Sequence, residues 1–125
     1  MAYYCVDHIK DQVTTIPTYT TGWLGGLNRA VNGFHEDQMS TTHPVRSVMP
    51  NTGLARMYFD SITYRKGMMT LKQLVFLMGE NNFFSGVTDY FNKFGWSNGT
   101  IDDFIASIEP YFESPDPEYT LTIWK

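Results

Sequence analysis

Apolar residues recur at helical spacing along most of this chain, and that pattern limits the fold more than any other feature of the sequence. The longest such segment runs from Ile62 to Met78. One face of it carries Tyr64, Met68, Leu71, Val75 and Met78, and Leu74 and Leu77 widen that face. Apolar groups on so much of the circumference indicate a helix that is buried on more than one side.

Four further segments show the same period, at about residues 6–13, 20–34, 83–94 and 100–108. In order, their apolar positions are Val6, Ile9 and Val13; Trp23, Leu24, Leu27, Val31 and Phe34; Phe83, Val87, Tyr90, Phe91 and Phe94; and Ile101, Phe104, Ile105 and Ile108. We expect the apolar residues of the segment 83–94 to face inward. The sequence therefore predicts a mainly α fold.

Glycines and caps refine this prediction. Gly22, Gly25 and Gly26 weaken the second segment as an isolated helix, and we interpret them as a sign of close packing. Thr100 followed by Asp103 is the signature of a helix N-terminus.

The organisation along the chain is simple. Pro115 and Pro117 follow the last periodic segment, so residues 115–125 are expected to form an exit strand or linker and residues 1–114 the helical part.

Composition excludes several classes of function. The chain has 125 residues, which suits one domain, and its 42% hydrophobic content argues for a packed core. Nine Lys and Arg residues are scattered singly in a chain of net charge −4, which argues against a nucleic-acid partner. We find no signal-peptide pattern and no membrane-spanning run, and the compartment stays open. Asn98 begins a glycosylation triplet, which matters only in a secreted protein.

Residue spacing alone reveals no active site. Cys5 is the single cysteine, which excludes an internal disulfide and a cysteine-based zinc site. His35 opens a segment, HEDQM, that begins like the zinc motif H-E-x-x-H, but Met39 stands where the second histidine is required. His43 precedes Pro44 in an extended stretch, and a ligand role for it alone is not supported. Asp102 and Asp103 are explained by capping.

A resemblance to a known family extends this reading. Asp37 precedes the triplet Thr42-His43-Pro44, and these are followed by FDSITYRKG at residues 59–67, by Gly79-Glu80 and by an N-x-T-x-x-D-F segment at residues 98–104. In order and spacing, residues 35–112 resemble the M1 family of zinc aminopeptidases. The resemblance implies the helical lobe of a thermolysin-like catalytic domain.

The same resemblance implies a role for one residue. Tyr64 falls at the position of the family's tyrosine that stabilises the oxyanion during peptide hydrolysis. A neutral phenol suits that task because it donates a hydrogen bond at pH 7. The alternative is that Tyr64 is a packing residue of the apolar face.

The family's zinc motif, H-E-x-x-H, occurs nowhere in the sequence. We therefore expect no cofactor in this chain, although the complete family enzyme uses zinc, and no activity from the chain alone. The first reading is a fragment of an M1 aminopeptidase, completed by the missing N-terminal half of the catalytic domain. The second is a non-catalytic structural or interaction subunit in a larger assembly. In either case Val6, Ile9, Leu74 and Leu77 are expected to be exposed in the chain by itself.

Overall fold

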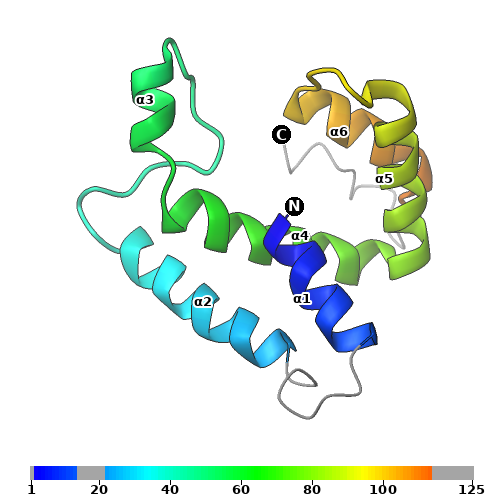
Figure 1. Ribbon diagram of the computed structural model, residues 1–125, viewed down its shortest axis with the longest axis horizontal. Coiled ribbons are helices and arrows are strands. Elements are labelled where there is room, and N and C mark those ends of the chain that lie inside the picture. The colour runs from blue at the N-terminus through cyan, green and yellow to red at the C-terminus, as the bar shows by residue number, and fades with distance from the viewer. Residues whose placement is uncertain (1, 14–21, 114–125) are drawn as a thin grey trace. The chain divides into compact units, whose positions relative to one another are not determined.

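The structure, a computed structural model, describes residues 2–13 and 22–113 (Figure 1). Most of these residues are helical and none is in a strand, so the prediction of a mainly α fold is confirmed. The helices are α1 (Ala2–Val13), α2 (Gly22–Asp37), α3 (Thr52–Met57), η1 (Ile62–Lys66), α4 (Gly67–Met78), α5 (Glu80–Phe94), α6 (Ile101–Ile108) and η2 (Glu109–Tyr111). The predicted exit segment, 115–125, lies outside the described residues.

The chain divides into two compact units, residues 1–72 and 73–125. In the first unit, α2 packs against both α1 and η1. In the second, α5 packs against α6 and η2, and Figure 1 shows α5 and α6 side by side. None of the described helices is long and apolar enough to cross a membrane.

Glycines rather than large apolar residues make the contact face of α2. Its buried residues are Gly22, Gly26, Ala30 and Gly33. A Cβ atom on Gly22 would lie 2.9 Å from the Asp7 carbonyl oxygen, so only glycine allows α1 to approach this closely. The close packing inferred from the glycines is confirmed for Gly22 and Gly26 and is wrong for Gly25, where an added Cβ would meet only Nη1 of Arg29 at 3.7 Å. The apolar stripe of α2 is instead largely exposed, at Leu24, Leu27, Val31 and Phe34.

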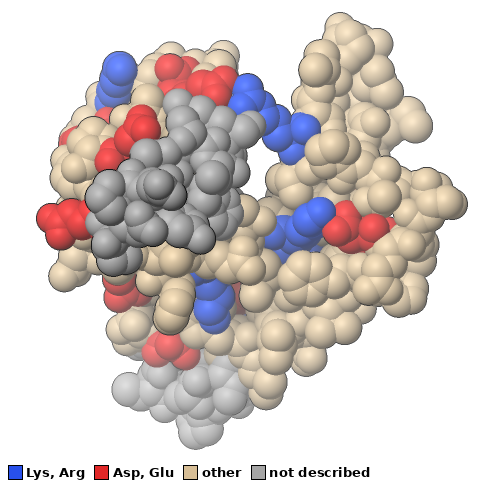
Figure 2. Space-filling model, turned by 180° about the vertical axis from the view of Figure 1, so that it is seen from behind, with Lys and Arg blue, Asp and Glu red and all other residues tan. Residues whose placement is uncertain are grey.

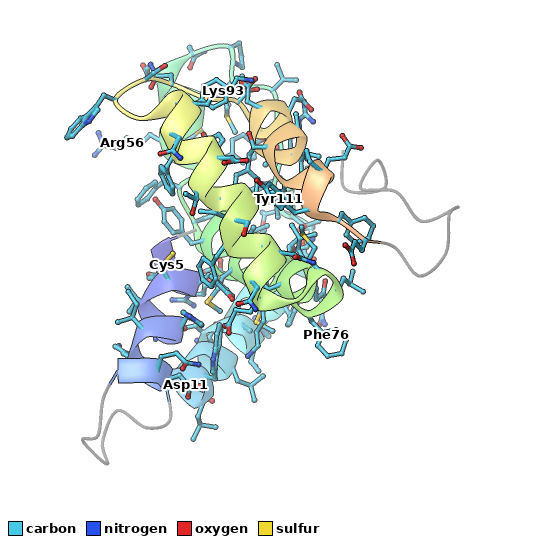
Figure 3. All side chains as sticks on the ribbon, turned by 90° about the vertical axis from the view of Figure 1, so that its right-hand side faces the viewer. Cys5, Asp11, Arg56, Phe76, Lys93 and Tyr111 are labelled. Atoms are coloured by element: carbon cyan, nitrogen blue, oxygen red, sulfur yellow. The ribbon has the colours of Figure 1, made fainter. Side chains whose placement is uncertain are left out.

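The expected exposure of four apolar residues is correct for three of them. Val6, Ile9 and Leu77 are exposed. The expectation for Leu74 is wrong, because its side chain is only 2% exposed. Phe76 is the residue of α4 that projects into solvent instead, as Figure 3 shows.

The second unit matches its sequence pattern at most positions. Phe83, Phe104 and Ile108 are buried, and Gly86 lets the backbones of α5 and α6 come close. Thr100 and Asp103 form the predicted capping box at the start of α6. The prediction that Phe91 faces inward is wrong, because 57% of this residue is exposed.

Candidate active site and its supports

Tyr64 lies on a π-helical turn, η1, that the sequence pattern did not predict. The predicted continuous helix from residue 62 to 78 is therefore interrupted at its start. Such single π turns are rare and occur frequently at functional sites. The turn separates Tyr64 from the buried face of the same segment: Tyr64 is 38% exposed, whereas Met68 is 1% exposed.

Two aromatic rings flank Tyr64. The centroid of the Phe59 ring is 4.7 Å from that of Tyr64 and the Tyr3 centroid is 5.7 Å away, both in edge-on geometry. These three residues line a hollow of about 320 Å³ together with Asp60, Ser61 and Arg65. The hollow therefore combines aromatic walls with two phenols, a carboxylate and a guanidinium, which suits a ligand that is partly polar.

Asp60 connects the start of the π turn to His43. One carboxylate oxygen accepts a hydrogen bond from the backbone N–H of Thr63 at 3.0 Å, and the Asp60 carbonyl accepts one from the N–H of Tyr64 at 3.2 Å. The other carboxylate oxygen lies 2.6 Å from Nε2 of His43. His43 also packs edge-on against the Tyr58 ring, with centroids 4.1 Å apart.

Asp37 holds the other end of the turn. Its carboxylate lies 2.7 Å from Nζ of Lys66, the last residue of η1, and accepts a hydrogen bond of 2.7 Å from Thr42. The bonds from Lys66 and then Thr42 are the main reasons why the pKa of Asp37 lies below its ordinary value.

Electrostatics around His43 and Asp60 favour the charged forms of both. Burial alone would lower the pKa of His43, but the bonds to Asp60 and to the Pro44 carbonyl outweigh it and raise the pKa above 6.5. Burial alone would raise the pKa of Asp60, but the bonds from His43 and Thr63 lower it below 3.8.

The π turn also depends on a glycine of α2. A Cβ atom on Gly33 would lie 2.9 Å from Cβ of Arg65 and 3.3 Å from the carbonyl oxygen of Ser61. The turn can therefore sit against α2 only because position 33 has no side chain.

We expect Gly33→Ala to destabilise the chain by about 1–3 kcal/mol, since the added methyl group meets backbone atoms that cannot move aside easily. Gly25→Ala, on the same helix, is the matched control. Its Cβ would have Nη1 of Arg29 at 3.7 Å as its nearest neighbour, so it should stabilise by about 0.5–1 kcal/mol through helix propensity. Urea unfolding followed by circular dichroism measures both, and changes of the same sign would contradict the expectation.

The other sequence candidates are not among the residues that line the hollow. His35 is exposed near the end of α2. Asp103 serves the cap of α6, and its backbone and side-chain bonds with Thr100 lower its pKa. Within residues 2–13 and 22–113, no three His, Cys, Asp or Glu side chains gather into a group that could hold a metal ion.

Sequence reasoning missed a buried ion pair between α1 and α2. Asp7 is fully buried and pairs with Arg29, whose guanidinium also lies 5.5 Å from the Tyr3 ring centroid. Lys72 stands 3.4 Å over the Trp23 ring, and burial is the main cause of its lowered pKa. Asp7 and Arg29 are 22 positions apart, so the local sequence pattern carried no signal for the ion pair.

Basic and acidic side chains are both present on one face of the molecule. On the face shown in Figure 2, Lys and Arg side chains are dispersed and acidic groups lie among them.

Comparison with known proteins places these features in a family context. The model of the peptidase family M1 domain matches residues 1–118. Aminopeptidase N of Streptomyces lividans is 37% identical over 76 residues, which are 61% of this chain and 9% of the relative.

Two further relatives cover more of the chain. Leucyl aminopeptidase of Saccharolobus solfataricus is 34% identical over 70% of this chain and 11% of its own length. Alanine/arginine aminopeptidase of Saccharomyces cerevisiae is 29% identical over 82% of this chain and 11% of its own length. The chain thus spans about a tenth of the curated relatives that it matches.

Proposed function

This chain belongs to the M1 peptidase family, and we propose on that basis that it supplies the helical lobe of an aminopeptidase catalytic domain, which removes N-terminal residues from peptides. The observation that carries the proposal is the placement of Tyr64 on an exposed π turn, between two aromatic rings and next to a hollow. A residue that served only the core would be buried like Met68.

The chemistry proposed for Tyr64 is hydrogen-bond donation to the oxyanion that forms when a peptide carbonyl is attacked. A phenol is neutral at pH 7 and keeps its proton, so it can donate to a developing negative charge. A donor held in place before the reaction stabilises the transition state more than the ground state. The exposed ring gives substrate access to the hydroxyl, and the bonds at Asp60 fix the turn that carries it.

The described residues do not fit the zinc that M1 enzymes use. His43, the histidine nearest to Tyr64 in the sequence, has Nδ1 2.9 Å from the Pro44 carbonyl and Nε2 2.6 Å from Asp60, so neither nitrogen is available to a metal. The family motif H-E-x-x-H is missing from the sequence. In the proposed enzyme, the zinc ligands and the general base therefore come from polypeptide other than these 125 residues.

We expect the purified chain to bind no stoichiometric zinc, because a tight site needs three preorganised protein ligands. Metal analysis and hydrolysis of an aminoacyl arylamide, each with and without the proteins that co-purify with the chain, test the proposal. Zinc and activity should appear only in the presence of such a partner. Stoichiometric zinc in the isolated chain that is lost in His35→Ala or His43→Ala would contradict it.

A second candidate function is a non-catalytic subunit of a larger assembly. The exposed stripe of α2, formed by Leu24, Leu27, Val31 and Phe34, favours it, because a contiguous apolar surface marks a contact site. The same purification separates the two functions. A stable complex that contains the chain but neither zinc nor peptidase activity supports the structural subunit.

A further inference from the structure

The turn that carries Tyr64 is held at both ends by one short segment, residues 37–43. At its start, Asp60 accepts hydrogen bonds from the backbone of Thr63 and Tyr64 and contacts His43. At its end, Lys66 pairs with Asp37. The side chains in these contacts are mostly shielded from water, with exposed fractions of 10% for His43 and 29% for Asp60. Contacts at this level of burial are screened less than surface ion pairs.

The contacts of His43 require a specific protonation state. Nε2 faces a carboxylate oxygen and Nδ1 faces a carbonyl oxygen, and both are acceptors. A neutral imidazole carries a proton on only one of its nitrogens, whereas the imidazolium can donate from both. Both contacts are therefore hydrogen bonds only while His43 is charged, and one of them is lost when it deprotonates.

We propose that His43 and Asp60 are a positioning pair that sets the place of Tyr64 through the backbone of the π turn, with Asp37 and Lys66 holding the opposite end. The route is short: His43 bonds to the Asp60 side chain, and the Asp60 backbone carbonyl accepts the N–H of Tyr64. This inference deepens the proposed function of Tyr64 and rests on it for its catalytic meaning. The geometric part of the inference stands without it.

Asp60 and His43 are both charged only within a limited range of pH. Asp60 has a lowered pKa, so its contribution to stability is present above 3.8 and is lost as the pH falls through its folded value. His43 has a raised pKa, so its contribution is present below 6.5 and is lost as the pH rises through its folded value. The other ionisable groups around His43 are Asp37, whose charge also favours the imidazolium, and Glu36 and Tyr58, which line the hollow beside it.

The first test uses the 125-residue chain with ¹³C-labelled tyrosine, observed by NMR. Tyr64 is assigned from Tyr64→Phe, and its ring signals report its place because the Phe59 and Tyr3 rings lie within 6 Å. In the parent, the Tyr64 signals should shift with the same midpoint as the His43 imidazole. The signals of Tyr90 and Tyr111 should not. In His43→Gln and in Asp60→Asn, the pH-dependent shift of Tyr64 should disappear.

His35→Gln is the matched control, because His35 is an exposed histidine on the neighbouring helix. It should leave the titration of Tyr64 unchanged. The inference would be overturned if the pH titration of the Tyr64 signals had a different midpoint from that of His43. It would also be overturned if His35→Gln changed this titration as much as His43→Gln does. Loss of the helical circular dichroism in both His43→Gln and Asp60→Asn would also overturn it, because the pair would then support the whole unit rather than the turn.

The second test measures kinetics in the enzyme completed by its zinc-binding polypeptide. His43→Gln should lower kcat by about 10²-fold with little change in KM, the effect of a small misplacement of a catalytic group. Added to Tyr64→Phe, it should cause almost no further loss, because both changes act through one hydroxyl. An additive further loss would overturn the positioning role. If Tyr64→Phe alone left kcat unchanged, the proposed function would fail while the NMR result still decided the geometric inference.

Discussion

Tyr64→Phe is expected to lower kcat by about 10²–10³-fold in an enzyme that contains both this chain and the zinc-binding polypeptide, which is the usual effect of removing one oxyanion donor. The substitution keeps the ring that packs against Phe59 and Tyr3 and removes only the hydroxyl. KM should change little, because an interaction made only in the transition state does not contribute to substrate binding. Hydrolysis of an aminoacyl arylamide measures both constants.

Tyr90→Phe is the control for this experiment. Tyr90 packs edge-on against Phe104 in the second unit, with ring centroids 5.3 Å apart, and it does not line the hollow. Tyr90→Phe therefore tests the loss of a tyrosine hydroxyl as such. Its turnover should equal that of the parent. If Tyr64→Phe also kept the turnover of the parent and instead lost about 1–3 kcal/mol of stability, Tyr64 would be a packing residue whose hydroxyl satisfies a buried partner.

Arg29→Met is expected to destabilise the chain by about 3–5 kcal/mol, because it leaves the fully buried carboxylate of Asp7 without its counter-charge. Among the described residues, one carboxylate oxygen of Asp7 already lacks a hydrogen-bond partner. Urea unfolding followed by circular dichroism measures the change.

Two further variants show whether the ion pair is the cause. Arg56→Met removes an exposed arginine from α3 and should change stability very little. Asp7→Asn combined with Arg29→Met removes both charges and should recover a large part of the loss, since a neutral amide is less costly to bury than an unpaired carboxylate. A loss in Arg29→Met no greater than in Arg56→Met would contradict the role of the pair.

Helical spacing and local capping rules determined the class of this fold. The segments with apolar residues three and four apart became α1, α2, α4, α5 and α6, and Thr100 with Asp103 formed the predicted capping box. These features depend on residues within one or two turns of each other, so their signal lies in the local sequence. The close packing predicted from the glycines of α2 was correct for Gly22 and Gly26.

The resemblance to the M1 family, also read from the sequence, identified Tyr64, and the family is confirmed by the match over residues 1–118. The role of Tyr64 stays a prediction. The motif showed which residues recur in the family but not why Asp37, His43, Asp60 and Lys66 accompany Tyr64. Their contacts join residues that are 17 to 29 positions apart in the chain. The helical spacing of apolar residues gives no information about such long-range pairs.

Tertiary structure alone decided which apolar face is buried and where the long helix changes its winding. Leu74 is buried although its position only widened the predicted face, while the stripe from Leu24 to Phe34 is exposed because the glycines opposite it allow a closer approach to α1 and η1. The π turn arises where Gly33 and the Asp60 contacts fix the backbone of residues 61–66. The sequence alone determined α1, α2, α4, α5 and α6, because their apolar spacing and caps are local. The place of Tyr64 depends on contacts between segments distant in sequence, and only folding brings those together.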